Sequence, residues 1–255
     1  MIMKKSSIKP AAKRAGLSPV ALAKGGGLEL YLKRIFALMF GAVALTAIST
    51  YATMMWGAHL AFNIAPEGYI IGMTPLFYIV VFGGLALAIF AQARVFSMRP
   101  ATGGLLLALY AIMMGFAIMP LVFVSLSVNP WSVLQAFIIA ALMFGCMALF
   151  GYRTTKNLGF LGIFLFIGMI GLILVGVASF IWPMIMGGTF GTVIAAIGVI
   201  IFALFTAYDM QFLKRAYAAG GDNTTKDQLA ILGALHLYIS FIAMFQYILM
   251  LLNRR

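Results

Sequence analysis

Seven long runs of apolar residues follow one another along the chain, separated by short segments that hold nearly all of the ionisable groups. Each run is long enough for a helix to cross a hydrocarbon core of roughly 30 Å. The runs are continuously apolar and far longer than barrel strands, so we predict helices, which satisfy their own backbone hydrogen bonds in lipid. The predicted spans are Ile35–Ala58, Thr74–Ala93, Leu105–Leu126, Trp131–Phe150, Phe160–Ile181, Thr189–Asp209 and Leu229–Leu252. The pattern indicates an all-α polytopic membrane protein.

Composition agrees with this fold class. Hydrophobic residues make up 64% of the 255 positions and charged residues only 9%, whereas a soluble domain needs much more surface charge. We therefore expect one seven-helix transmembrane domain over residues 28–255, preceded by a flexible, basic, cytoplasmic tail over residues 1–27. No cleavable signal is evident in that tail. It is expected to touch anionic lipid head groups, or alternatively to serve as a handle for a cytoplasmic partner.

The positions of the basic residues predict the topology. The N-terminal region carries Lys4, Lys5, Lys9, Lys13, Arg14, Lys24, Lys33 and Arg34; the connections after the second, fourth and sixth runs carry Arg94 and Arg99, Arg153 and Lys156, and Lys214, Arg215 and Lys226. The other connections, 66–71, 127–130 and 182–188, contain no Lys or Arg. The positive-inside rule then places the N-terminus in the cytoplasm. The net charge of +12 is dispersed around membrane segments, which argues against a nucleic-acid partner.

Two terminal arginines, Arg254 and Arg255, fall on the other side if all seven runs cross the membrane. An alternative is that the seventh run is re-entrant, which would put both ends of the chain in the cytoplasm. Two terminal residues do not outweigh the fifteen basic residues on the other side, so seven crossings are the prediction.

One carboxylate stands inside an apolar run, and this makes Asp209 the main candidate for function. An ionised group in the membrane is costly, so its presence there indicates a functional role. His236 and Ser240 lie four residues apart in the following run and share one helical face. If the last two helices pack side by side, Asp209 and His236 meet at similar depth and titrate as a coupled pair. Such a pair predicts a pH-sensitive gate.

Structural alternatives exist for each of these residues. Asp209 would be a helix-end carboxylate if it paired with Arg94, Arg99 or Lys214 at the water interface. His236 would be an ordinary core histidine if it bonded a backbone carbonyl. Asp222 and Asp227 lie in a polar loop and are expected to be solvated. A hydrolase based on Ser240 and His236 is disfavoured because no oxyanion device is visible.

Several blocks in the second half of the chain carry a family resemblance. They are Gly151–Leu158, Phe160–Gly162, Leu165–Ile173, Ile197–Phe202, Tyr208–Gln211, Leu213–Lys214, Ala234–Leu235, Leu237–Tyr238, Phe241–Ile242 and Phe245. These blocks, in this order, resemble the Bax-inhibitor-motif family, which includes the bacterial YetJ-like and YccA-like membrane proteins. The resemblance implies a seven-helix bundle with the last helix at its centre. We expect neither enzymatic activity nor a cofactor. The absence of a cleavable signal and the charge bias favour a bacterial inner membrane, with an organelle membrane as the alternative.

The resemblance further implies a pH-sensitive calcium leak, gated by two aspartates and an arginine. Asp209 matches the first aspartate and would meet calcium only weakly and transiently. Arg94 is the best match for the arginine, with Arg99 as the alternative. Ser240 stands where the second aspartate is found in those relatives. Serine at this site is similar to the YccA-like branch, which implies the alternative function of modulating a membrane-anchored ATP-dependent protease complex.

Overall fold

The computed structural model describes residues 27–64, 70–220 and 222–254 of the chain. Seven of the helices within these ranges are long and apolar enough to cross a membrane. They are α3 (Gly27–Trp56), α5 (Pro75–Arg94), α6 (Pro100–Val128), α7 (Ser132–Arg153), α8 (Gly159–Ile181), α9 (Gly188–Ala218) and α10 (Asn223–Leu252). This confirms the prediction of an all-α polytopic membrane protein. The predicted tail, residues 1–27, lies almost entirely outside the described residues.

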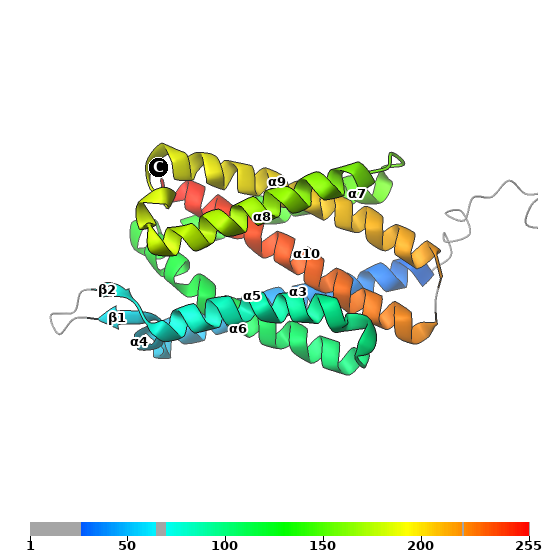
Figure 1. Ribbon diagram of the computed structural model, residues 1–255, viewed down its shortest axis with the longest axis horizontal. Coiled ribbons are helices and arrows are strands. Elements are labelled where there is room, and N and C mark those ends of the chain that lie inside the picture. Colours follow the sequence, from blue (N-terminus) through cyan, green and yellow to red (C-terminus); the bar gives the residue numbers. More distant parts are fainter. Residues whose placement is uncertain (1–26, 65–69, 221, 255) are drawn as a thin grey trace, which may run out of the picture.

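The helices form two layers with α10 between them (Figure 1). The first layer consists of α5, α6 and α3, and the second consists of α8, α9 and α7. α10 packs against both layers, and Leu237, Tyr238 and Met244 on it are completely buried. The expectation that the last helix occupies the centre of the bundle is confirmed.

Several helices continue beyond the apolar runs at one end of the bundle. α3 begins at Gly27, α9 continues to Ala218, and α10 begins at Asn223. Lysine, arginine and glutamine are good helix formers, so a helix has no reason to stop where its apolar run stops. We call this end the basic end, and it carries Lys33, Arg34, Arg94, Arg99, Arg153, Lys156, Lys214, Arg215 and Lys226.

The opposite end contains two strands that the sequence analysis did not predict. After the short helix α4 (Ala58–Ala61), β1 (Phe62–Ile64) pairs antiparallel with β2 (Ile70–Met73). The β-branched and aromatic residues of these segments favour strands. They were missed because each strand is only three or four residues long. Two single-turn 3₁₀ helices, η1 (Val95–Ser97) and η2 (Pro183–Met186), complete the described elements.

α10 runs through the whole bundle from one end to the other. At the basic end, Gln228 Nε2 donates to the carbonyl oxygen of Met98 at 2.8 Å, in the α5–α6 connection. At the opposite end, Arg254 Nη1 donates to the carbonyl oxygen of Gly188 at 2.5 Å and to Thr192 Oγ1 at 3.1 Å. The alternative of a re-entrant seventh run is therefore wrong. These bonds also give a structural role to Arg254, a basic residue at the end of the bundle opposite the basic end, because they hold the start of α9.

Buried hydroxyl groups attach the first layer to α10. Thr46 Oγ1 of α3 lies 2.6 Å from the Tyr238 hydroxyl of α10 and donates to the carbonyl oxygen of Ala111 on α6 at 3.1 Å. α3 and α6 approach closely at Gly115, where an added Cβ would lie 2.6 Å from the carbonyl oxygen of Thr46. A small residue lets two membrane helices come near enough for such bonds.

Candidate functional site

Asp209 lies on α9 in the part of the bundle where α7, α9 and α10 meet. Its residue surface is only 6% exposed. Gly151 lets α7 and α9 touch there. An added Cβ at Gly151 would lie only 2.1 Å from the carbonyl oxygen of Ala207 on α9, so a larger residue would force the two helices apart. Thr206, on the preceding turn of α9, is fully buried and donates to its own helix at Phe202. The local sequence therefore places a carboxylate inside a closely packed helix contact.

Two polar side chains after Asp209 fix this part of α9 to the α7–α8 connection. Gln211 Nε2 donates to the carbonyl oxygen of Lys156 at 2.7 Å, and its Oε1 accepts from the Leu158 amide at 2.9 Å. Lys214 Nζ donates to the carbonyl oxygen of Tyr152 at 2.6 Å. Lys214 is thus engaged with α7 and forms no ion pair with Asp209. The bonds hold the turn that carries the carboxylate.

His236 is the basic side chain that meets Asp209. Its Nδ1 lies 3.5 Å from Asp209 Oδ1, and no other Lys, Arg or His of the described chain lies within 4.0 Å of that carboxylate. The Asp209 side chain is 8% exposed and the His236 side chain 27%. At 3.5 Å the contact is longer than a normal hydrogen bond, so attraction depends on opposite charges.

The second ring nitrogen of His236 contacts α5. His236 Nε2 lies 3.1 Å from Gln92 Oε1. A protonated imidazole carries N–H on both nitrogens, so it can donate to Asp209 and to Gln92 at once, whereas a neutral ring has one N–H. The ring of His236 therefore links α9 of the second layer, α10, and α5 of the first layer.

The arginines expected near Asp209 lie elsewhere. Arg94 and Arg99 are both exposed, and neither lies within 4.0 Å of a described carboxylate. The contact from α5 comes from Gln92, two residues before Arg94. Sequence reasoning missed Gln92, although it is the one amide side chain in α5, a helix that is almost entirely apolar before Arg94. A single amide side chain in an apolar helix was the signal in the sequence that could have identified Gln92 as a candidate.

Ser240 is 3% exposed and lies one turn after His236 on α10. Both ring nitrogens of His236 have other partners, Asp209 and Gln92. The histidine is therefore not arranged as a base for the serine hydroxyl, as nucleophilic catalysis would require. Ser240 contributes a neutral hydroxyl on this turn of α10, so Asp209 has no carboxylate partner there.

The two other carboxylates near the basic end have structural partners. Asp227 forms an ion pair with Arg34, which joins α10 to α3. The expectation that Asp227 is simply solvated is wrong, because α3 extends further than predicted and brings Arg34 to it. Asp222 caps α10 by accepting from the Thr225 amide at 3.0 Å, and hydrogen bonding from Thr225 lowers the pKa of the Asp222 carboxyl.

Comparison with known proteins agrees with the fold. The family model "Inhibitor of apoptosis-promoting Bax1" matches residues 28–255. The chain is 35% identical over 226 residues to an uncharacterized protein of Caulobacter vibrioides, covering 88% of each chain. It is 29% identical over 234 residues to the inner membrane protein YbhL of Escherichia coli, covering 90% of this chain and 93% of YbhL. It is also 28% identical over 229 residues to an uncharacterized protein of Rickettsia prowazekii. The match begins where α3 begins and includes all seven long helices.

Proposed function

The chain belongs to the Bax inhibitor family of membrane proteins, and on that premise we propose that it is a proton-sensitive, calcium-permeable leak. The gate is the contact between Asp209 and His236. The observation that carries the proposal is the 3.5 Å approach of these two side chains inside the bundle. A titratable pair in a membrane interior is a candidate for function rather than for stability.

The direction of the pH response follows from the charges of the pair. When Asp209 is ionised and His236 is protonated, opposite charges attract across the contact between α9 and α10. A further proton on the carboxylate removes this attraction and leaves an imidazolium beside a neutral acid. Protonation of His236 creates the attraction, and protonation of Asp209 at lower pH removes it, so the leak increases as the pH falls through the range in which the carboxylate is protonated.

Gln92 transmits this change to the first layer. Its Oε1 accepts from His236 Nε2, so a movement of the ring also alters the contact between α10 and α5. The three helices that meet at His236 come from both layers and from the centre of the bundle. A local loss of charge pairing can thus separate the two layers at the basic end, which is the step a gate requires.

Calcium passes this site without being held tightly. Calcium takes about six to eight oxygen ligands, and Asp209 supplies two at most. Within residues 27–64, 70–220 and 222–254, no three His, Cys, Asp or Glu side chains gather as a metal site. A single carboxylate attracts a divalent cation and releases it readily, as a leak pathway needs.

Calcium flux into liposomes tests the proposal. Purified protein is reconstituted with an indicator dye in the lumen, and uptake is recorded at about pH 4, 5 and 6, a range in which an ordinary histidine is already mostly protonated and an ordinary aspartate gains its proton. We expect wild-type flux to rise as the pH falls. Asp209→Asn imitates the protonated carboxyl and should leak at every pH. Asp222→Asn, which changes a carboxylate outside the pair, should behave as wild type.

Two results would contradict the proposal. Flux equal to that of protein-free liposomes at every pH would remove the leak. A normal pH response in Asp209→Asn would remove the gate from this pair while leaving the leak.

We also propose the orientation and location of the protein. The basic end faces the cytoplasm of a bacterial inner membrane, where Lys and Arg are retained and anionic lipids are available. Cysteine accessibility distinguishes the two orientations. A single cysteine at the exposed position Thr155, in a Cys146→Ser background, should react with an impermeant maleimide only after the cells are opened. Labelling in intact cells would reverse the assignment.

A second candidate is a modulator of a membrane-anchored ATP-dependent protease. It is favoured by Ser240, which leaves Asp209 without the second carboxylate of a two-aspartate latch. The test is a pull-down in mild detergent, with the full chain and with a chain lacking residues 1–27. Recovery of a membrane protease with the full chain supports this function, and recovery of none contradicts it.

A further inference from the structure

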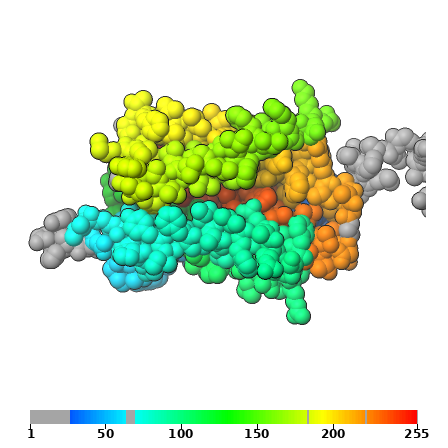
Figure 2. Space-filling model, in the orientation of Figure 1, coloured from blue at the N-terminus to red at the C-terminus, as the bar shows by residue number. Residues whose placement is uncertain are grey.

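A cavity of about 490 Å³ opens between α5 and α8, far from Asp209 along the bundle. α10 and α6 form its floor, and the hollow is visible in Figure 2 between the cyan α5 and the yellow-green α8, with the red-orange α10 at its base. α5 and α8 approach each other mainly through Phe180, whose ring centroid lies 5.4 Å from that of Tyr78 and 5.8 Å from that of Phe82. Beside this contact the two helices leave a hollow over the part of α10 that carries Gln246 and Tyr247.

The cavity opens toward lipid. The outer faces of α5 and α8 carry large exposed apolar side chains such as Ile79, Ile89, Phe166 and Leu174. In a membrane these faces contact acyl chains, and the cavity between them has an almost entirely apolar lining. Water is a poor occupant of such a space, because it finds few polar partners there. An acyl chain has the matching chemistry.

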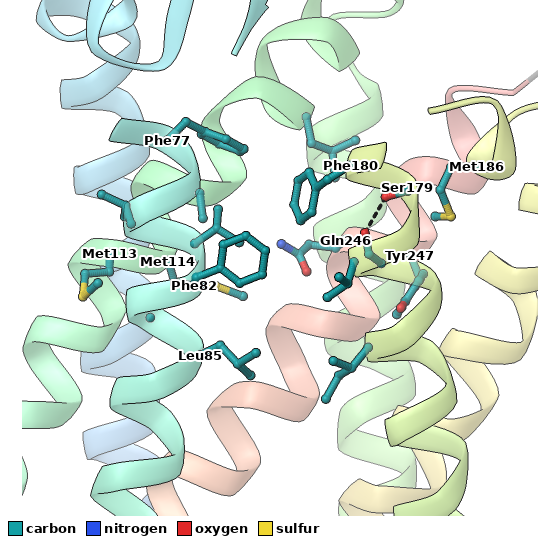
Figure 3. Close-up of a pocket in the computed structure, with 18 of the residues that line it drawn as sticks. Phe77, Phe82, Leu85, Met113, Met114, Ser179, Phe180, Met186, Gln246 and Tyr247 are labelled. Atoms are coloured by element: carbon teal, nitrogen blue, oxygen red, sulfur yellow. Dashed lines mark hydrogen bonds between the residues drawn. The ribbon is translucent and has the colours of Figure 1, made fainter. Parts of the chain in front are cut away.

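A few polar groups interrupt this lining: the hydroxyls of Tyr110, Ser179 and Tyr247, and the Gln246 amide. Ser179 donates to the carbonyl oxygen of Gly176 on its own helix at 2.6 Å. Gln246 projects from α10 into the cavity, and no hydrogen bond joins its amide to another residue drawn in Figure 3. It lies six residues before the last residue of α10, which is about 9 Å along the helix axis. That depth is close to the level at which ester groups join acyl chains to the head group. An amide N–H facing lipid needs an acceptor, and an ester carbonyl is one.

A cation lies at the rim of the same cavity. Met186 of η2 lines the cavity, and its carbonyl oxygen accepts from Arg254 Nη2. A guanidinium has five N–H donors, and the contacts to Met186, Gly188 and Thr192 use three of them. The described connections at this end, 62–64, 70–74, 129–131 and 182–187, contain no Lys or Arg. Among the described residues of this end, Arg254 is the one Lys or Arg, and it keeps free donors beside an apolar groove, which suits a phosphate.

We propose that this groove binds an anionic phospholipid from the leaflet at the Arg254 end. One acyl chain lies between α5 and α8 over α10, its ester carbonyl accepts from Gln246, and its phosphate pairs with Arg254. The proposal stands independently of the leak. The bound chain completes the wall that α5 and α8 leave open.

Photo-crosslinking tests the site. The protein is reconstituted with a phosphatidylglycerol or a phosphatidylcholine that carries a diazirine in one acyl chain, and the labelled peptides are mapped. We expect labelling concentrated on the cavity faces of α5, α8 and α10, stronger with phosphatidylglycerol. Arg254→Gln should bring the two lipids to similar labelling, and Gln246→Leu should lower labelling with both.

A matched pair of glycines on α8 controls for folding. An added Cβ at Gly176, which lines the cavity, or at Gly171, which does not, meets no atom within 4 Å. Gly176→Phe should fill the groove and reduce cavity labelling severalfold, while Gly171→Phe should leave it unchanged.

Three outcomes overturn the proposal. The first is equal labelling in both phenylalanine variants, and the second is labelling spread evenly over all lipid-facing helices. The third is crosslinking chiefly between two copies of the chain, which would make the groove a protein interface. If Gly176→Phe does not fold, the Gln246→Leu and Arg254→Gln results decide.

Discussion

Gln92 of α5 and His236 of α10 meet at 3.1 Å between Oε1 and Nε2, on the side of the imidazole ring opposite Asp209. The neutral amide, rather than a guanidinium, brings the first layer to the contact between Asp209 and His236. An amide can accept from or donate to the ring. If the protonation of His236 changes, the Gln92 amide can rotate and present its NH2 group instead of its oxygen to the ring. Because the amide is neutral, this rotation leaves no charge unpaired.

Nitrogen NMR of labelled histidine should detect this arrangement directly. The chain has two histidines, His59 and His236, and His59 is exposed at the opposite end. We expect Asp209→Asn and Gln92→Leu each to shift the imidazole signals of His236, because the first neutralises the partner of Nδ1 and the second removes the partner of Nε2. The His59 signals serve as the internal control and should stay in place. Unchanged His236 signals in both variants would contradict the contacts.

Gly151→Ala should destabilise the bundle. The new Cβ would lie 2.1 Å from the carbonyl oxygen of Ala207, so α7 and α9 must move apart, at a cost of about 1–3 kcal/mol for overpacking. Gly145→Ala on the same helix is the control, because its Cβ meets nothing within 4 Å. That change should be neutral or stabilising by about 0.5–1 kcal/mol. Thermal unfolding in detergent compares the two, and equal midpoints would be the contrary result.

Arg254→Ala should loosen the start of α9. The guanidinium donates to Gly188, Thr192 and Met186, and losing charged hydrogen bonds of this kind costs about 2 kcal/mol. Amide hydrogen exchange should become faster over residues 184–192. Arg153→Ala, which removes an exposed arginine at the basic end, should leave that segment unchanged. Equal protection in the two variants would show that Arg254 does not hold this junction.

Asp222 should make the first turn of α10 sensitive to acid. Hydrogen bonding from Thr225 lowers the pKa of the Asp222 carboxyl below its ordinary value of 3.8. The folded pKa lies below the unfolded one, so the stabilisation is fully present above the ordinary value and is lost as the pH falls through the folded value. Amide protection of Thr225 and Lys226 should therefore decrease at acid pH.

Asp222→Asn is the control for this response. Asparagine also caps a helix but does not titrate, so its first-turn protection should not change over the same pH range. Protection that falls equally in both proteins would place the acid response elsewhere.

Much of the architecture follows from the sequence because a bilayer imposes strict rules on it. Seven apolar runs of spanning length must be helices, and the placement of Lys and Arg groups their ends. The candidates Asp209 and His236 were also visible in the sequence, because polar groups are rare in such runs. The β1–β2 hairpin was not, since it lies beyond the spans and is too short to give a clear pattern.

The side chains that meet Asp209 depended on tertiary structure. Gln92 and Arg94 are two residues apart, which separates them by about 200° around α5. In an almost uniformly apolar helix, no stripe of polar residues reveals which of these directions faces α10. The contact between α5 and α10 therefore selected Gln92, and the extension of α3 gave Asp227 its partner Arg34. The sequence alone determined which segments cross the membrane and which polar groups lie within them. Helix rotation and packing decided which of those groups touch, because lipid-facing and buried faces have the same apolar composition.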